Sequence, residues 1–188
     1  MKIAFLIIFL TIIPLVCHAP SIDFELKINR LRTMIEYANK RHHELEFLKF
    51  ALDLGYRESG NNWLAINLIG CFGEWQFAES TLKILGYRKI TLKKFKSDPN
   101  IFPREMQVQA LKGLIKLNMH YLRKYEHFIG DTINDVVITK SGIIAASHLG
   151  GARTVMSFLD SGGKINRKDV LGTSVYSYMK RFSGYDLE

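Results

Sequence analysis

Apolar side chains recur at helical spacing near the start of the chain, with charged residues between them. The apolar members of the first such stretch are Phe24, Ile28, Leu31, Ile35 and Ala38. Steps of three and four residues place side chains on one face of an α-helix. The pattern therefore predicts an amphipathic helix over residues 24–38.

A second helix is predicted to follow and to end near Gly55, since glycine is common directly after a helix. Its apolar positions are Leu45, Leu48, Ala51 and Leu52. The carboxyl group of Glu58 consequently falls at or just beyond a helix C-terminus, at the edge of the surface on which that helix packs.

Further helices are predicted downstream. Ser80 or Glu79 caps a short helix that ends at Gly86. Pro103 suits the first position of a helix, because its missing N–H has no partner there. The helix that it opens runs to about Tyr121 and is predicted to be the longest of the chain.

The last third of the chain predicts mostly helix as well. The elements expected there are an extended piece at 136–138, a helix from Thr139 or Ser141 to Gly150, a helix over 152–159 and a last helix capped by Thr173 or Ser174. No repeat, linker or low-complexity segment interrupts these elements. We therefore expect one compact, all-α domain.

The first residues have the pattern of an export signal. Lys2 is followed by 14 residues, Ile3 to Val16, that are apolar apart from one threonine and one proline. That length suits the core of a signal peptide better than a membrane-spanning helix. We predict a signal peptide over 1–19 and a mature domain over 20–188, periplasmic or secreted. Cys17 offers an alternative, a lipid anchor that tethers the protein to the membrane.

The chain is basic, with a formal net charge of +8. An exported basic protein suits an anionic partner such as a cell wall or a membrane surface, although the charge can equally serve solubility. A basic helical protein can also be a DNA-binding domain. The predicted export signal and the lack of a recognition helix lined with lysine and arginine argue against nucleic acid as a partner.

Cysteine and histidine spacing predicts no disulfide, metal site or cofactor. Without Cys17, Cys71 is the only cysteine, and its neighbours Ile69 and Phe72 are apolar. A packed small side chain is therefore favoured over a reactive thiol. The sequence contains neither CxxC nor HExxH, so we expect no metal.

The segment from Glu58 to Thr81 has the regularity of neither a helix nor a strand. It is rich in glycine and asparagine, which tolerate unusual backbone angles. It also carries four large aromatic side chains, Trp63, Phe72, Trp75 and Phe77. Aromatic rings beside amides suit a cleft that binds sugars, whereas the alternative is a well-packed structural loop.

The order of residues in this segment resembles the lytic transglycosylase and goose-type lysozyme family. That family has a Glu-Ser pair, a spacer, and then Gly-x-x-Gly-x-x-Gln. Here Glu58 and Ser59 match the pair, and Gly70, Gly73 and Gln76 match the second motif. Asn62 and Thr81 also occupy positions where the family commonly has these residue types.

The resemblance continues downstream and covers most of the chain from about Glu44. Residues 146–150 stand where the family has an Ala-Tyr-Asn-Ala-Gly-like stretch, and Arg153 and Val155 follow as they do there. Tyr178 takes the place of a tyrosine that lies close to the catalytic acid. The resemblance implies a lysozyme-like helical domain.

The chain departs from the family pattern at three places. Glu74 and Trp75 replace a hydrophobic pair, Ser147 and His148 replace Tyr-Asn, and Ser174 stands where a second glutamate is expected. The match is thus to a divergent branch of the family.

The resemblance implies that one carboxyl group, that of Glu58, cleaves the bond between N-acetylmuramic acid and N-acetylglucosamine in peptidoglycan. Glu58 would protonate the glycosidic oxygen and then deprotonate the C6 hydroxyl of the sugar, which closes a 1,6-anhydro ring. A glutamate with an ordinary pKa of about 4.3 must then keep its proton near neutral pH. Phe72, Phe77 and the preceding helix are expected to supply the apolar surroundings that raise this pKa.

The resemblance also implies contacts to substrate from Ser59, Gln76, Phe77, His148 and Tyr178. Gln76 either bonds a substrate amide or shapes the backbone, and Ser59 either bonds nearby or caps the turn. His148 either contacts sugar or fills the core. Tyr178 either holds the catalytic carboxyl group through its hydroxyl or simply packs. The implied protein acts as a monomer on glycan strands, without a cofactor.

Two alternatives remain open. A hydrolytic muramidase needs a second carboxyl group, for which Glu74 is the main candidate. Asp53 is expected to face solvent, and Glu79 is expected to belong to a helix start. A non-catalytic peptidoglycan-binding module is the other alternative, and the intact Glu58 argues against it.

Overall fold

The computed structural model of the protein describes residues 22–170 and 172–187. The predicted signal peptide and the alternative tether at Cys17 lie outside the described residues. The chain divides into two units, the first up to Lys40 and the second from Arg41 to Glu188. None of the described helices is long and apolar enough to cross a membrane.

The first described element, α1, runs from Ile22 to Ser59. The sequence predicted helix on both sides of residue 40, which is confirmed, but it also predicted two separate helices and an end near Gly55, which is wrong. The helix continues through Gly55 and ends only at Ser59. With 38 residues it is also longer than the 19-residue helix that begins after Pro103.

Within the second unit, the buried face of α1 differs in part from the predicted one: of the four predicted positions only Ala51 is buried. Phe50 and Leu54 are fully buried. Leu45, Leu48 and Leu52 are instead about half exposed, with exposed fractions of 51%, 54% and 49%. Phe50 and Leu54 are spaced i, i+4 and so lie on one face, which packs on the core. The leucines alone therefore suggested the wrong face.

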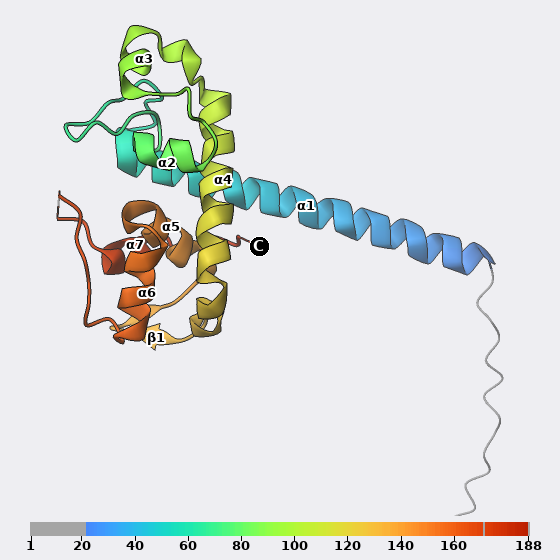
Figure 1. Ribbon diagram of the computed structural model, residues 1–188. Coiled ribbons are helices and arrows are strands. Elements are labelled where there is room, and N and C mark those ends of the chain that lie inside the picture. Colours follow the sequence, from blue (N-terminus) through green and yellow to red (C-terminus); the bar gives the residue numbers. More distant parts are fainter. Residues whose placement is uncertain (1–21, 171, 188) are drawn as a thin grey trace, which may run out of the picture. The chain divides into compact units, whose positions relative to one another are not determined.

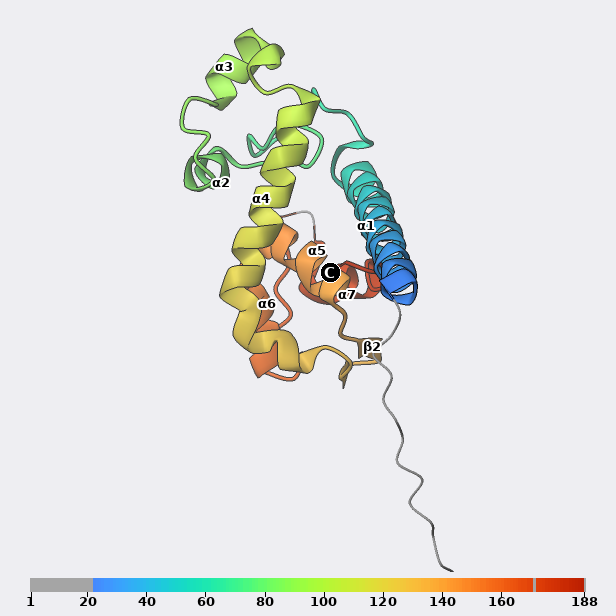
Figure 2. The ribbon, with the colours of Figure 1, turned by 90° about the vertical axis from the view of Figure 1, so that its right-hand side faces the viewer.

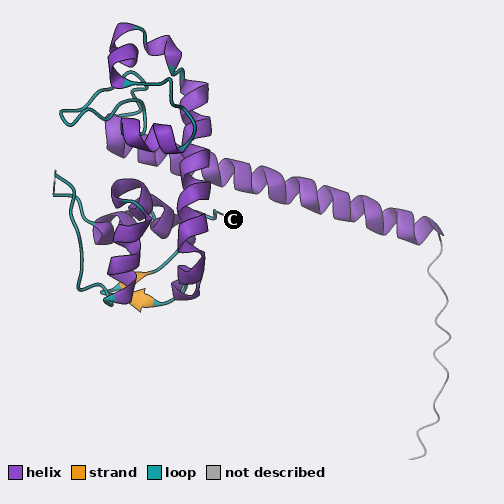
Figure 3. Ribbon diagram, viewed as in Figure 1, coloured by secondary structure: helices purple, strands orange, loops and turns teal. Residues whose placement is uncertain are grey.

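The second unit is built mainly of short helices (Figure 3). After α1 the elements are α2 (Glu79–Ile84), α3 (Leu92–Ser97), η1 (Pro99–Ile101), α4 (Arg104–Leu122), η2 (Arg123–Phe128), β1 (Thr132–Ile133), β2 (Val136–Val137), α5 (Lys140–Gly150), α6 (Ala152–Asp160) and α7 (Val175–Arg181). The strands β1 and β2 form one small antiparallel hairpin. The all-α fold class predicted from the sequence is confirmed.

Several predicted helix starts are confirmed. The Thr139 hydroxyl accepts a hydrogen bond from Gly142 N and caps α5, and Ser174 caps α7. Other starts differ from the prediction. The residue before α2 is Ala78, which offers no side-chain cap, and Pro103 precedes α4 instead of occupying its first position. The helix α3 was not predicted from the sequence.

The helix α4 connects the two groups of helices in the second unit (Figures 1 and 2). The elements α2 and α3 lie towards its N-terminal end, whereas α5, α6 and α7 lie towards its C-terminal end. Near the N-terminal end the core is aromatic: Phe72 packs against Phe95 with the rings tilted and their centroids 4.8 Å apart, and Phe102 contacts Phe72 and Phe77 edge-on.

Two helical glycines offer a matched test of the packing of α5 against α7. A Cβ at Gly142 in α5 would lie 2.9 Å from the backbone oxygen of Met179 in α7, whereas a Cβ at Gly113 in α4 would meet nothing closer than 3.6 Å. We predict that Gly142→Ala lowers the free energy of unfolding by about 1–3 kcal/mol through overpacking. Gly113→Ala should raise it by about 0.5–1 kcal/mol, because alanine loses less backbone entropy. Urea denaturation measures both, and equal effects would contradict the α5–α7 contact.

Candidate active site

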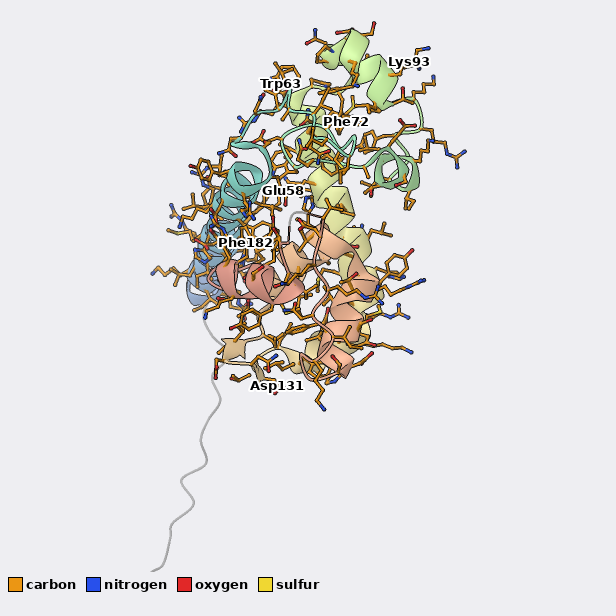
Figure 4. All side chains as sticks on the ribbon, turned by 90° about the vertical axis from the view of Figure 1, so that its left-hand side faces the viewer. Glu58, Trp63, Phe72, Lys93, Asp131 and Phe182 are labelled. Carbon is orange, nitrogen blue, oxygen red and sulfur yellow. The ribbon has the colours of Figure 1, made fainter. Side chains whose placement is uncertain are left out.

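Glu58 lies in the last turn of α1, where its carboxyl group meets a residue 120 positions later in the chain. The hydroxyl group of Tyr178 in α7 donates a hydrogen bond of 2.7 Å to Oε1 of Glu58. Figure 4 shows Glu58 between the loop that carries Trp63 and Phe72 and the helical region of Phe182. The predicted pairing of Tyr178 with the Glu58 carboxyl group is therefore present.

Tyr178 is almost fully buried. Burial raises the pKa of its hydroxyl group well above the usual range, and the negative charge of Glu58 and the hydrogen bond to it raise this pKa further. The hydroxyl group thus stays protonated at any physiological pH. It acts as a permanent donor to the Glu58 carboxyl group.

Glu58 opens onto a cavity of about 500 Å³. The walls come from the end of α1, the irregular loop, α5, the segment before α7, and α7 itself. The lining residues are Arg57, Glu58, Ile66, Asn67, Leu68, Ile69, Cys71, Gln76, His148, Leu149, Asp169, Val170, Thr173 and Tyr178. We call this space the Glu58 cavity.

A second cavity of about 790 Å³ adjoins the first. The two share Cys71, Gln76, His148 and Leu149 as lining residues. The second cavity continues between α2, α4 and the start of α6. Together the two cavities form an extended cleft with Glu58 in one part, which suits a chain-like ligand better than a small compact one.

The loop between α1 and α2 takes its shape from its own polar side chains. Oδ1 of Asn67 accepts hydrogen bonds from the backbone N–H groups of Ile69 (3.1 Å) and Cys71 (2.9 Å). Phe72 forms isolated backbone bridges with Ile66 and with Phe77. The prediction of an irregular, turn-rich segment is confirmed.

The amide of Gln107 in α4 ties this loop to the core. Its Oε1 accepts from the backbone N–H of Glu74 at 2.7 Å, and its Nε2 donates to the backbone oxygens of Phe102 at 2.8 Å and Trp63 at 3.0 Å. Gln107 is fully buried. Gly73, with φ of 86°, passes so close that a Cβ there would lie 2.6 Å from this Oε1.

Glu74 does not line either cavity. Its side chain is fully buried and forms a bidentate ion pair with Arg104, with distances of 2.6 and 2.8 Å. A carboxylate held in this way anchors the loop to α4. The placement removes Glu74 as the second carboxyl group of a hydrolase.

Ser59 and Gln76 were both predicted to contact substrate, but their side chains form hydrogen bonds to backbone groups of the loop. The Ser59 hydroxyl donates to the backbone oxygen of Glu74 at 2.7 Å and accepts from Asn62 N, and Ser59 lines neither cavity. Nε2 of Gln76 donates to the backbone oxygen of Gly73 at 2.7 Å. Gln76 nevertheless lines both cavities, so it both shapes the cleft and faces it.

His148 stands where the two cavities meet. Its Nε2 lies 2.9 Å from the backbone oxygen of Trp75, which can only accept, so Nε2 carries the proton. Nδ1 is buried and has no hydrogen-bond partner among the described residues. The ring packs edge-on against Phe77, which is buried and contributes to the wall of the second cavity.

The aromatic residues of the loop belong to the core more than to the cleft. Phe72 and Trp75 are buried and line neither cavity, and Nε1 of Trp75 donates to the backbone oxygen of Ala51 at 2.8 Å. The expectation that Phe72 and Phe77 surround Glu58 is wrong. The apolar residues of the Glu58 cavity are Ile66, Leu68, Ile69, Leu149 and Val170.

The other acidic candidates also have structural partners. Asp53 was expected to face solvent, but it accepts hydrogen bonds from Arg181 at 2.7 Å and from the Tyr185 hydroxyl at 3.1 Å. Glu79 begins α2 as predicted, and its carboxylate accepts from Leu92 N at 3.1 Å. Neither residue lines the cleft.

The structure adds Arg57, Asp169 and Arg153 to the cleft, which the sequence analysis did not select as site residues. Arg57 donates to Oγ1 of Thr173 at 3.0 Å, and Asp169 accepts from Thr173 N at 2.7 Å. Arg57 is sequence-adjacent to Glu58, a signal that could have suggested it. Nothing in the local sequence marked Asp169.

Cys71 lies at the junction of the cavities, where burial raises the pKa of its thiol. The raised pKa keeps the thiol protonated at neutral pH, but its partly exposed position at the cavity wall differs from the packed one that was predicted. Among residues 22–170 and 172–187, no group of three or more histidine, cysteine, aspartate or glutamate side chains is placed to hold a metal ion.

Comparisons with known proteins give no relative for this chain. No family model, curated protein or solved structure matches it.

The Glu74–Arg104 pair yields a stability test. Arg104→Met leaves a buried carboxylate without its partner, and we predict a loss of about 3 kcal/mol in the free energy of unfolding. The double variant Glu74→Gln with Arg104→Met removes the charge as well, and it should recover part of this loss. Urea denaturation at neutral pH measures both. A loss below about 0.5 kcal/mol for Arg104→Met would show that the pair does not anchor the loop.

Proposed function

We propose that the protein cleaves the glycan strands of peptidoglycan as a lytic transglycosylase, with Glu58 as general acid and then general base. The observation that carries this proposal is the Glu58 carboxyl group, held by a buried tyrosine hydroxyl at 2.7 Å and opening onto an extended cleft. The substrate, peptidoglycan, is inferred from the resemblance of the motifs around Glu58 to those of the lytic transglycosylase family. The all-α fold is consistent with it.

The reaction needs one protein carboxyl group and no water. Protonated Glu58 gives its proton to the glycosidic oxygen as the bond from that oxygen to C1 of N-acetylmuramic acid breaks. The oxygen of the C6 hydroxyl then bonds to C1, and its proton passes to the Glu58 carboxylate. Glu58 is thereby returned to its starting state, and the product carries a 1,6-anhydro ring.

The walls of the cleft support a sugar ligand. The Glu58 cavity combines the polar side chains of Asn67 and Gln76 with exposed apolar ones such as Leu68 and Val170. N-acetyl sugars present both hydroxyl or amide groups and apolar ring faces, so a mixed surface of this kind suits them. Because peptidoglycan lies outside the cytoplasm, the proposal agrees with the predicted export signal.

A hydrolytic muramidase is the second candidate, and one observation favours it. Asp169 lines the same cavity as Glu58 and is near enough for its charge to raise the pKa of Tyr178. A second carboxylate across the cavity can act as the base that activates water in an inverting hydrolase. We favour the transglycosylase because Asp169 already accepts a backbone hydrogen bond within its own loop.

Product analysis tests the role of Glu58. Wild-type protein incubated with purified peptidoglycan should release muropeptides with 1,6-anhydro ends, which mass spectrometry detects. Glu58→Gln keeps the shape of the side chain but has no proton to give, so release should fall at least about 100-fold. Glu126→Gln, which changes an exposed glutamate away from the cleft, is the matched control and should retain full activity.

Each other outcome has a definite meaning. Products that are one water heavier would replace the transglycosylase with the hydrolase. Binding of wall material by both wild type and Glu58→Gln, without any release, would support the binding module instead. Equal release by wild type and Glu58→Gln would remove Glu58 from the chemistry.

Asp169→Asn separates the two reactions directly. Asparagine keeps the oxygen that accepts from Thr173 N but loses the charge. For a transglycosylase we predict anhydro products at a rate within about threefold of wild type. For a hydrolase that uses Asp169 as its base, the rate would fall about 100-fold or more. The same chromatographic assay with mass detection reads both results.

A further inference from the structure

The second cavity contains a single permanent charge among the described residues that line it. Its walls include apolar side chains from α2, α4 and α6, represented by Ile84, Leu114 and Met156. The charge is the guanidinium group of Arg153, the second residue of α6. The cavity therefore pairs an extensive apolar surface with one cation.

The guanidinium group of Arg153 has no protein partner among the described residues. No hydrogen bond or ion pair joins it to a carboxylate, whereas Arg104 and Arg181 each pair with one. An arginine that forms no ion pair at the wall of a cavity is available to a ligand. Its planar fork matches a carboxylate in particular.

The remaining polar features of this cavity favour an anion as well. The helix α6 begins at the cavity with Gly151, which gives no side-chain cap to the first N–H groups. No acidic side chain lines the cavity. The Glu58 cavity differs, because Glu58 and Asp169 are both there. A negatively charged group of a ligand is therefore favoured at the Arg153 end of the cleft over the Glu58 end.

We propose that the second cavity binds the peptide stem of a muramic acid residue and that Arg153 pairs with a carboxylate of that stem. This inference rests on the proposed function. The stem combines short alkyl side chains with free carboxylates, which complement the apolar walls and the single cation of this cavity. The residues shared by the cavities, Gln76 and His148 among them, allow one strand to place a sugar at Glu58 and a stem at Arg153.

The test compares two substrates. One is peptidoglycan strands with intact stems, and the other is the same strands after an amidase has removed the stems. Wild type should turn over stem-bearing strands about tenfold faster than stem-free strands, measured as kcat/KM from released anhydro products. A charge-assisted hydrogen bond is of this order when partly exposed.

Arg153→Gln should lose that preference, with kcat/KM about tenfold lower on stem-bearing strands and unchanged on stem-free strands. Arg153→Lys keeps the positive charge and should retain part of the preference for stem-bearing strands. Arg123→Gln, which removes an exposed arginine outside both cavities, is the matched control and should behave as wild type. Thermal melting of each variant confirms that it is folded.

The outcomes distinguish this inference from the function on which it rests. Wild type that is active on both substrates, with Arg153→Gln unchanged on both, would overturn the stem site and leave the proposed function intact. An equal loss on both substrates would assign Arg153 to the sugar backbone and overturn the stem site. Wild type that releases nothing from either substrate would overturn the proposed function itself.

Discussion

The buried amide of Gln107 is the constraint on which the cleft depends. The loop between α1 and α2 has little regular structure to satisfy its backbone groups, and a buried group without a partner costs about 1–3 kcal/mol. One side chain of α4 supplies three partners at 2.7–3.0 Å, to Glu74, Trp63 and Phe102. The approach is so close that residue 73 has to be glycine. The second glycine of the predicted motif is thus explained by packing.

Two further contacts connect this amide to the residue beside Glu58. Arg104 lies about one turn before Gln107 on α4 and forms an ion pair with the side chain of Glu74. The backbone N–H of the same glutamate donates to Gln107. The backbone oxygen of Glu74 in turn accepts from the hydroxyl of Ser59. Ser59 is the neighbour of Glu58. The end of α1 is therefore fixed to the loop through the Ser59 hydroxyl, so Ser59 has a structural role beside the proposed catalytic role of Glu58.

The helical class and the irregular loop could be predicted from sequence, because apolar spacing and residue types indicate them. The pairing of Tyr178 with Glu58 was expected only from the family resemblance. The buried face of α1 could not, since leucines occupy both sides of the helix and only tertiary packing decides between them. The role of Glu74 could not be predicted either. Its neighbours in the sequence, a glycine and a tryptophan, do not reveal whether the carboxylate faces a cleft or pairs with Arg104, 30 residues later. Asp169 could not be selected, because only the folding of distant segments brings it to the cavity of Glu58.

The contact between Tyr178 and Glu58 constrains how the carboxyl group can work. The Tyr178 hydroxyl donates to Oε1, and the raised pKa of the phenol means that it continues to donate whether Glu58 is protonated or not. Oε1 therefore keeps this donor in either protonation state of Glu58. Oε2 has no hydrogen-bond partner among the described residues, so it is the oxygen more open to a ligand. In the proposed reaction, the proton would leave from and return to Oε2, and the glycosidic oxygen and the C6 hydroxyl would reach the same side of the carboxyl group in turn.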